Sequence, residues 1–362
     1  MKKQALTIFV LFLCGVFTSP ARAQETIRGD WTAEYMTRAR SKDSTPKILL
    51  TMKAGSDATG HHFNSTFSVP LADLRGLSLS ETALDLPQVR FELQRDAGTF
   101  IFEGLFRNGK GIGEFRFEPN SGYIAGMRSM GYNDLPMNKI FELAMFDVSR
   151  NFIQEMGSLG YTELPVNRLV EFRIHGVSPD YVRDLRSAGF TELSASKLVE
   201  MRIHGVSPEY ISEMKSAGYE DLTANKLVEM RIHGVTPNYI SEMKAAGYTE
   251  LSADRLVEMR IHGVTPEFVN KVKELGYDNL SANKLVEMRI HGVTPAFIGE
   301  IKEVGYGGLP INKLVEFRIH GISANFIKEL KAAGYTDLSA DDIVEIRING
   351  RGGFERKSKR SQ

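Results

Sequence analysis

Six histidines recur along this chain at a fixed interval, and imidazole is the commonest metal ligand and proton carrier near neutral pH. They are His175, His204, His233, His262, His291 and His320. In a stack of helical repeats, equivalent atoms lie roughly 10 Å apart, whereas zinc needs nitrogen ligands at about 2.0–2.1 Å. Equivalent histidines therefore cannot share an ion without further ligands, and we predict neither metal nor cofactor. A histidine in the last turn of a helix instead meets the negative end of the helix dipole.

A basic and an acidic residue accompany each histidine and complete a polar stripe on one side of a helix. The stripe consists of Arg168, Glu171 and His175; Lys197, Glu200 and His204; Lys226, Glu229 and His233; Arg255, Glu258 and His262; Lys284, Glu287 and His291; and Lys313, Glu316 and His320. One interpretation is solvated ion pairs, each contributing a few tenths of a kcal/mol. The other is a surface that docks an extended partner, as arrays of repeats commonly do. The second interpretation makes the stripe the candidate partner-binding site.

An arginine recurs beside this stripe, on the apolar side of the same helix. The series is Arg173, Arg202, Arg231, Arg260, Arg289, Arg318 and Arg347. An unpaired charge among apolar residues is costly. We therefore predict a partner for each guanidinium, either an acid of the preceding helix, such as Glu213 or Glu242, or the carbonyl groups at a helix end. These arginines are interpreted as structural clamps between repeats.

The remaining sequence offers no recognisable catalytic motif. The single cysteine, Cys14, lies in the apolar N-terminal segment, so the rest of the chain has no thiol for catalysis, disulfides or thiolate metal sites. The sequence contains neither G-x-S-x-G nor H-E-x-x-H nor a glycine-rich phosphate loop. We therefore predict a protein that is not an enzyme.

The elements that must position the stripe come from a repeat of 29 residues. Eight ungapped copies fill residues 119–350 and begin at Pro119, Val148, Val177, Val206, Val235, Val264, Val293 and Ile322. A fixed period of this length is typical of a stacked array. The period differs from the 34 residues of tetratricopeptide repeats and the 33 of ankyrin repeats.

Each copy carries the start and stop signals of two helices. In the copy at 206–234, Ser207 can cap the first helix, Pro208 suits its first position, and Gly218 suits the positive φ that follows its end. Thr223 and Gly234 do the same for the second helix. Each copy is therefore predicted to be an αα-hairpin with helices of about ten residues, too short to be stable alone.

The second helix of each copy is apolar over more than half of its circumference. In the copy at 206–234 the apolar residues are Leu227, Val228, Met230 and Ile232. A surface helix needs a narrower apolar face. We therefore expect each helix to be buried by its partner and by the neighbouring copy, with Val228 and Ile232 both inside. The prediction is an all-α solenoid of eight repeats.

Residues 24–118 have a different pattern, with apolar residues at alternate positions. Six strands are predicted, at 29–36, 47–52, 63–69, 89–94, 99–106 and 111–117. Pairs such as Phe100 and Phe102 should share one face of antiparallel strands. We predict a small antiparallel β-sandwich or barrel, so that the whole chain is an α+β multidomain protein. In the first helical copy Phe146 replaces the histidine, and we expect it to face this β-domain.

The two ends of the chain bear on localisation. Residues 1–23 have the charged, apolar and small-residue regions of a signal peptide, so we expect cleavage near Ala23 and an exported, periplasmic or extracellular protein. Residues 351–362 form a basic tail that we expect to be disordered, with contact to an anionic membrane surface as the alternative. Cleavage would shift the formal net charge from zero to minus three, which favours neither nucleic acid nor membrane as partner. No segment is long and apolar enough for an integral membrane span.

The phrases VTPEFV (264–269), AAGYTELS (245–252) and LVEMRIHG (227–234) resemble αα repeats of uncharacterised function in exported bacterial proteins. Similar repeats are appended to some membrane metallopeptidases of the antibiotic-sensor type. The resemblance covers 119–350 and includes no peptidase domain, so it implies no peptidase activity.

These observations together predict a non-enzymatic protein of the cell envelope that binds or scaffolds another protein through the surface of its repeat array. Two alternatives remain open. The β-domain could carry a small apolar ligand, as some barrels do, or the chain could be an accessory or regulatory protein of a hydrolase.

Overall fold

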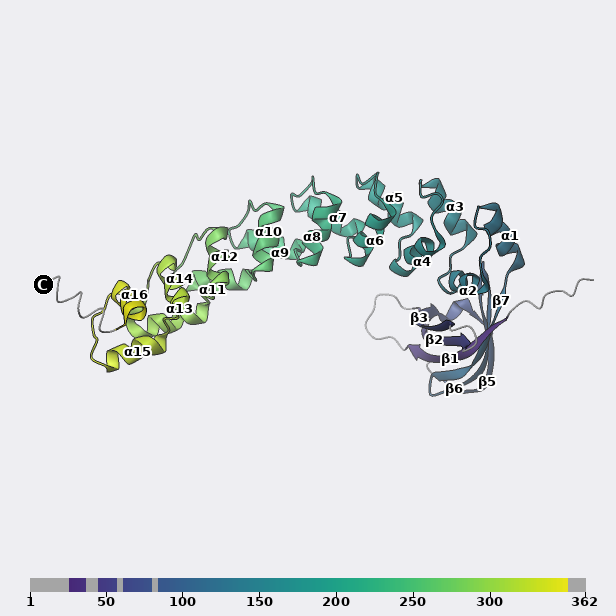
Figure 1. Cartoon of the computed structure of the whole chain (residues 1–362), viewed down its shortest axis with the longest axis horizontal. Helices are drawn as coiled ribbons and strands as arrows, with labels where there is room; N and C mark the ends of the chain where they lie inside the picture. The colour runs from purple at the N-terminus through teal and green to yellow at the C-terminus, as the bar shows by residue number, and fades with distance from the viewer. Residues whose placement is uncertain (1–25, 37–44, 57–60, 80–83, 351–362) are drawn as a thin grey trace, which may run out of the picture. The chain divides into compact units, whose positions relative to one another are not determined.

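The computed structural model describes residues 26–36, 45–56, 61–79 and 84–350. They form an antiparallel β-sheet followed by a long series of short helices, so the predicted α+β class is confirmed (Figure 1). The chain divides into two compact units, one ending at Gln154 and one beginning at Glu155. The predicted signal peptide, its expected cleavage site near Ala23 and the basic tail lie outside the described residues.

The β-sheet contains every strand that the sequence predicted, and one more. The strands are β1 (Ile27–Met36), β2 (Lys47–Ser56), β3 (His61–Pro70), β4 (Leu74–Arg75), β5 (Leu86–Arg95), β6 (Gly98–Arg107) and β7 (Lys110–Pro119), with a 3₁₀ turn η1 (Leu71–Asp73). They form one curled sheet, a half-barrel, in the order β3-β2-β1-β7-β6-β5-β4, and every neighbouring pair is antiparallel. The predicted sandwich is wrong, since a sandwich needs two sheets. Within the described strands the sheet stays open, because β3 and β4 are its edges.

Aromatic rings fill the inner face of the sheet. The predicted period-two residues share this face: Phe102 pairs with Phe91 on β5 and with Phe115 on β7, and all three are buried. The Phe91 and Phe102 rings stack with centroids 4.7 Å apart. Trp31 packs edge-on against both rings, and its indole N–H lies within hydrogen-bonding distance of the backbone oxygens of Glu103 and Glu114. The sheet therefore has its own apolar core.

The first two helices, α1 (Ser121–Ser129) and α2 (Met137–Met145), belong to the same unit as the sheet. Phe141 of α2 is buried, and its ring meets the ring of Phe117 edge-to-face at a centroid distance of 5.4 Å. It also contacts Phe100 and Phe63. The residue expected to face the β-domain, Phe146, is only half-buried. Phe141, five residues earlier, contributes these ring contacts to the sheet.

An ion pair joins the loop between β5 and β6 to the first turn of α3 (Arg150–Ser158). The Arg150 guanidinium donates to both carboxylate oxygens of Asp96, at 2.6 and 3.0 Å, and the Arg150 backbone N–H donates to the same carboxylate at 2.8 Å. Hydrogen bonds from Arg150 hold the pKa of Asp96 below its ordinary value. This contact fixes the start of α3 against the sheet within the first unit.

The remaining helices continue the alternation of a first and a second helix in each 29-residue copy. They are α4 (Val166–His175), α5 (Pro179–Ser187), α6 (Ala195–Ile203), α7 (Pro208–Ser216), α8 (Ala224–Ile232), α9 (Pro237–Ala245), α10 (Ala253–Ile261), α11 (Pro266–Glu274), α12 (Ala282–Ile290), α13 (Pro295–Ile301) with its extension η2 (Lys302–Tyr306), α14 (Ile311–Ile319), α15 (Ala324–Ala332) and α16 (Ala340–Asn349). We call the odd-numbered helices A helices and the even-numbered ones B helices.

The predicted helix signals are confirmed in the copy at 206–234. The Ser207 hydroxyl accepts the Tyr210 N–H at the start of α7, and the Thr223 hydroxyl accepts the Lys226 N–H at the start of α8. Gly218 follows α7 with φ +95°, a conformation that other residues adopt only at a cost. Each helix therefore begins and ends where its own residues place it.

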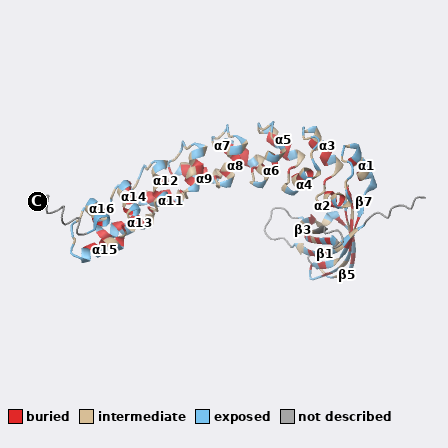
Figure 2. Ribbon diagram, viewed as in Figure 1, coloured by how far each residue is buried: buried red, intermediate tan, exposed pale blue. Residues whose placement is uncertain are grey.

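Helices of one kind follow one another in chain order within the second unit. Among the B helices, α4 contacts α6, and contacts between successive B helices continue to α16. Among the A helices, contacts run in the same way from α5 to α13. Figure 2 shows that these helices have buried and exposed sides along their lengths. Neighbouring copies therefore bury each other's apolar residues.

One expected core residue lies outside. Leu227, Val228 and Met230 are buried as predicted, with Val228 only 3% exposed. Ile232, however, is 54% exposed, and its equivalents in the other copies are equally open. Neighbouring helices cover the side of α8 that carries Leu227 and Met230, and this cover ends before it reaches Ile232. The prediction that Ile232 is buried is therefore wrong.

Candidate partner-binding surface

The residues of the predicted polar stripe do come together along the B helices. In α8, Lys226 forms an ion pair with Glu229, one turn later on the same helix. Lys226 also pairs with Asp254 at the start of α10, and so links two copies. The same i,i+3 pair recurs in the other B helices from α4 to α14, as Arg168–Glu171, Lys197–Glu200, Arg255–Glu258, Lys284–Glu287 and Lys313–Glu316. The stripe is thus a continuous series of charged pairs on the exposed side of the B helices.

These pairs leave the acid more accessible than the base. The Lys226 side chain is 26% exposed, whereas that of Glu229 is 43% exposed. The hydrogen bonds that Lys226 donates to Asp254 and Glu229 raise the pKa of Lys226 above its ordinary value, so the lysine stays charged. A molecule that approaches this surface therefore meets carboxylates before ammonium groups.

The histidines of the stripe are half-buried, and their backbone carbonyls have a defined role. The carbonyl of His204 accepts a hydrogen bond from Arg231 of the next copy. Within the part of the chain that the structure describes, no three His, Cys, Asp or Glu side chains lie close enough to hold a metal ion. Each histidine of the stripe lies at the C-terminal end of its B helix, directly before a glycine.

The recurring arginine connects two copies, as its interpretation as a clamp requires. Arg260 Nε donates to the carbonyl oxygen of His233 at 3.3 Å, and its guanidinium lies over the Tyr239 ring, 4.9 Å from the centroid. Of the two partners that the sequence left open, the structure therefore shows the helix-end carbonyl. Gly234 makes room for this contact, because a Cβ there would lie 2.8 Å from Arg260 Nη2. The same bond is formed by Arg202, Arg231, Arg289, Arg318 and Arg347.

Arg173 is the first member of the arginine series and lies in α4, where it is half-buried. Arg202, Arg231 and Arg260 are likewise half-buried, whereas Arg289, Arg318 and Arg347 are exposed.

Other contacts between copies escaped the sequence analysis. The Tyr210 hydroxyl donates to the carbonyl of Val235 at 2.9 Å, and the Tyr219 hydroxyl donates to that of Leu251 at 2.7 Å. Lys244 donates to the carbonyl of Ala217 at the end of the preceding A helix. The sequence does show that these tyrosines and lysines recur with the 29-residue period. Periodicity alone, however, does not distinguish a hydroxyl that is hydrogen-bonded to another copy from one exposed to water.

The buried tyrosines predict a loss of stability in alkali. Burial raises the pKa of Tyr181, Tyr210 and Tyr239 to about 12, from an ordinary value near 10. The unfolded chain therefore releases these protons first, and the tyrosines' contribution is complete below about pH 10 and declines as the pH rises through about 12. We expect urea midpoints to fall between about pH 9 and pH 11, and to fall less in a variant with all three tyrosines changed to Phe. An equal fall of the urea midpoint with pH in the parent and in the variant would contradict this expectation.

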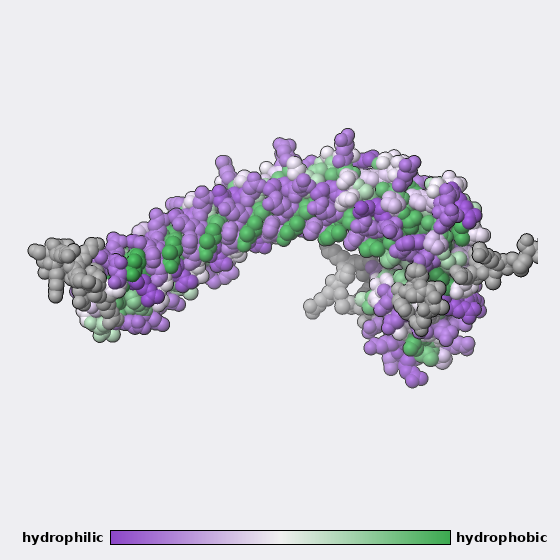
Figure 3. All heavy atoms as spheres, viewed as in Figure 1, coloured by the Kyte–Doolittle hydropathy of each residue, from purple (hydrophilic) through white to green (hydrophobic). Residues whose placement is uncertain are grey.

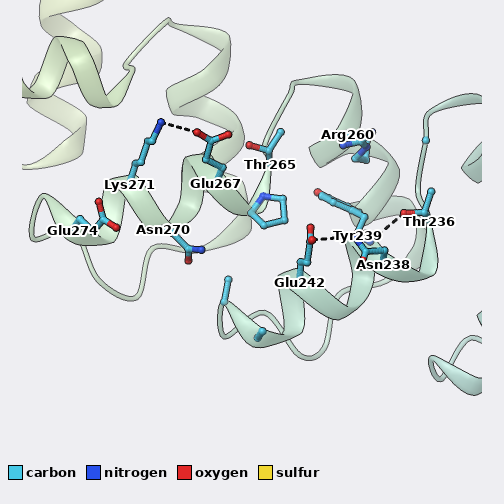
Figure 4. A pocket seen from close by; sticks show the side chains of 14 residues that line it. Thr236, Asn238, Tyr239, Glu242, Arg260, Thr265, Glu267, Asn270, Lys271 and Glu274 are labelled. Carbon is cyan, nitrogen blue, oxygen red and sulfur yellow. Dashed lines mark hydrogen bonds and ion pairs between the residues drawn. The ribbon is translucent and has the colours of Figure 1, made fainter.

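The A helices carry a groove on their own surface. It has a volume of about 780 Å³ and lies between α9 and α11 (Figure 4). Its polar groups are largely paired with each other: Asn238 donates to Glu242 at 2.9 Å, and Lys271 pairs with Glu267 at 2.6 Å. Arg260 and Tyr239, also on its lining, already contact one another. The groove therefore presents few polar groups that lack a partner.

The exposed isoleucines are the feature that the sequence analysis missed. They are Ile174, Ile203, Ile232, Ile261, Ile290, Ile319 and Ile348, all between 53% and 59% exposed. We call this series the isoleucine ladder. Among the described residues of the helical copies, no other large apolar side chain is comparably exposed. The isoleucines could have been noticed because they recur every 29 residues. Their angular position on the helix, however, lies within the apolar arc, so the sequence analysis assigned them to the core.

No helix in the described ranges combines the length and the apolar character that a bilayer span requires. Comparison of the chain with protein-family models and with curated proteins finds no match.

Proposed function

We propose that the helical part of this chain is a solenoid of eight αα repeats, exported to the cell envelope, that binds another protein along the exposed side of its B helices. The observation that carries the proposal is the recurrence of one exposed set of side chains at a fixed interval. The charged pair repeats from α4 to α14, and the isoleucine from α4 to α16, each with nearly constant exposure. A partner with its own period can contact such a surface at many equivalent points.

The contacts between copies support this function, because they hold the exposed set in place. Arg260 and Lys244 each donate to a carbonyl of the preceding copy, and Tyr239 donates to a carbonyl of the following one. A rigid array loses little conformational freedom when a partner binds, so more of the contact energy appears as affinity. A scaffold benefits from this property, whereas an enzyme also needs a reactive group.

The alternative of a ligand carrier finds less support in the β-sheet. Rings from Trp31, Phe91, Phe102 and Phe106 contact one another on its buried face, with centroids at most 6.5 Å apart. Phe141 covers neighbouring rings of the same face. A carrier needs interior space for its ligand, and these side chains occupy it. The accessory role to a hydrolase would itself be a form of protein binding.

Affinity capture from an envelope extract tests the proposed function. The mature protein is compared with a variant in which Glu229, Glu258 and Glu287 are changed to Lys. We expect the variant to lose the captured partner, because the stripe carboxylates of three successive B helices have changed sign. Recovery of a small molecule without any protein would instead favour the carrier.

A matched control keeps the change in net charge and moves it to the A helices. Glu213, Glu242 and Glu274 are exposed on α7, α9 and α11, and their change to Lys should leave capture intact. If both variants retain the partner, the stripe is not the docking surface. If both lose it, net charge decides capture and not this face of the array. Thermal melting of each variant checks that the array still folds.

A further inference from the structure

The isoleucine ladder is exposed in helical copies whose other large apolar side chains, among the described residues, are better covered. Ile232 and Ile261 are 54% and 55% exposed, while Val228 and Val257 on the same helices are each 3% exposed. Figure 3 shows hydrophobic patches at regular intervals along the helical copies, separated by hydrophilic residues. Single exposed apolar residues are ordinary, but seven that recur at one interval along one surface can contact a partner with its own period at several points.

The ladder stops where the helices meet another part of the fold. In α2 the equivalent residue is Met145, which is buried, in the unit that contains the sheet. The isoleucines are thus exposed only in the copies whose B helices have a free side. The ladder is a property of the array surface and not of the 29-residue unit alone.

The spacing of the ladder restricts the partner's backbone. B helices in contact lie about 8–10 Å apart, so successive isoleucines recur at roughly that distance. A β-strand presents side chains on one face about every 6.7 Å, and an α-helix presents one residue per heptad about every 10.5 Å. A polyproline II segment presents every third residue on one side, at about 9.3 Å. Of these backbones, polyproline II matches the ladder within the expected range.

The charge beside the ladder restricts the partner's composition. Glu229 lies three residues before Ile232, so the two side chains are neighbours on the helix surface. Glu229 is more exposed than its partner Lys226, and Asp254 at the start of the next B helix is 80% exposed. On the side of the stripe, an apolar segment bound to the isoleucines would therefore be bordered by carboxylates, which favour basic side chains on the partner.

We propose that the isoleucine ladder binds an extended polyproline II segment with an apolar residue at every third position and lysine or arginine between them. This inference rests on the proposed function and specifies its surface and its partner. Each apolar residue of the segment packs between successive isoleucines, and its basic residues lie against the glutamates of the stripe. Because polyproline II has a preformed backbone without internal hydrogen bonds, such a segment loses little entropy on binding.

A designed peptide tests the match of period and charge. The probe is a fluorescent peptide of six Leu-Pro-Lys triplets, and the control peptide has the same composition with its leucines in adjacent pairs. We expect the triplet peptide to bind the mature protein at least about tenfold more tightly by fluorescence anisotropy, a difference that corresponds to about 1.4 kcal/mol. Added salt should weaken this binding. Equal affinity for the two peptides, or tighter binding of a cationic amphipathic helix, would overturn the proposal.

Variants of the ladder locate the binding site. Ile232, Ile261 and Ile290 are changed together to Ser, which should leave folding intact because these side chains are exposed. The matched control is Ile112→Ser, since Ile112 is 57% exposed but lies on β7. We expect the triple variant to lose at least about tenfold in peptide affinity, and the control to lose none. Equal affinity of the triple variant and the parent would exclude the ladder.

The same variants separate this inference from the proposed function. If the triple isoleucine variant still captures the envelope partner while the glutamate variant does not, the proposed function stands and the ladder proposal fails. If the captured partner is lost with the isoleucines, both are supported. A second copy of this chain is the other molecule that could occupy the ladder, and analytical ultracentrifugation tests for it. If the parent dimerises and the triple isoleucine variant does not, a second copy occupies the ladder and the peptide proposal is overturned.

Discussion

Phe141→Ala is expected to lower the free energy of unfolding of the first unit by about 3–5 kcal/mol, the usual cost of removing a buried phenylalanine ring. Phe141 is 3% exposed, and its ring contacts Phe63, Phe100, Phe115 and Phe117. The substitution leaves a cavity between α2 and the sheet that these rigid rings cannot fill. Loss of packing between the first helical copy and the sheet should therefore destabilise both.

Urea unfolding followed by tryptophan fluorescence measures this effect directly. Trp31 is the only tryptophan of the chain, and it lies in the core of the sheet. The control is Phe146→Ala, one turn later in the same copy and only half-buried. It should cost less than half as much, because its ring is already partly exposed to water. If Phe146→Ala lowered the free energy of unfolding more than Phe141→Ala does, Phe146 and not Phe141 would be the main contact between α2 and the sheet.

Arg260→Ala is expected to lower the free energy of unfolding of the second unit by about 2 kcal/mol. A hydrogen bond from a charged group contributes about 1.5–3 kcal/mol, and a cation over a partly exposed ring contributes about 0.5–1 kcal/mol. Arg260 makes both contacts, but it is only half-buried, so the lower part of the combined range applies. The substitution also leaves the carbonyl of His233 without its donor.

Circular dichroism during thermal and urea unfolding measures the change, with two variants as references. Arg260→Lys keeps the charge but loses the planar guanidinium over Tyr239, so it should fall between parent and Arg260→Ala. Lys271→Ala removes a solvent-exposed ion pair with Glu267, so its unfolding midpoint should stay close to that of the parent. Equal midpoints for Arg260→Ala and the parent would show that the arginine does not act as a clamp.

The local structure of this chain could be read from its residues because the signals are themselves local. A hydroxyl before a proline, as at Ser207, and a glycine at the end of a helix, as at Gly218, act on backbone groups within one turn. The alternation of Phe100 and Phe102 likewise identifies one face of one strand. The structure confirms these elements to within a few residues, and in the described residues it adds the two-residue strand β4, the 3₁₀ turn η1 and the extension η2.

The partners of the predicted site residues needed more than the pattern. The sequence placed the recurring arginine among apolar residues and required a partner for it, but an acid and a carbonyl fitted equally well. The observed contact with the carbonyl of His233 depends on the distance between successive B helices, which no residue of one copy specifies. The predicted polar stripe did come together, because its i,i+3 spacing lies within one helix.

The sequence by itself determined the secondary structure, the 29-residue period and the residues that share each helix face. Only the tertiary structure decided that the strands form one open sheet, that Phe141 joins the first helices to it, and that Ile232 is exposed. The physical reason is that periodicity defines which side chains point the same way, whereas burial depends on how far the next element extends over them. Val228 and Ile232 lie on adjacent parts of one helix surface, and the neighbouring helices cover the first but not the second.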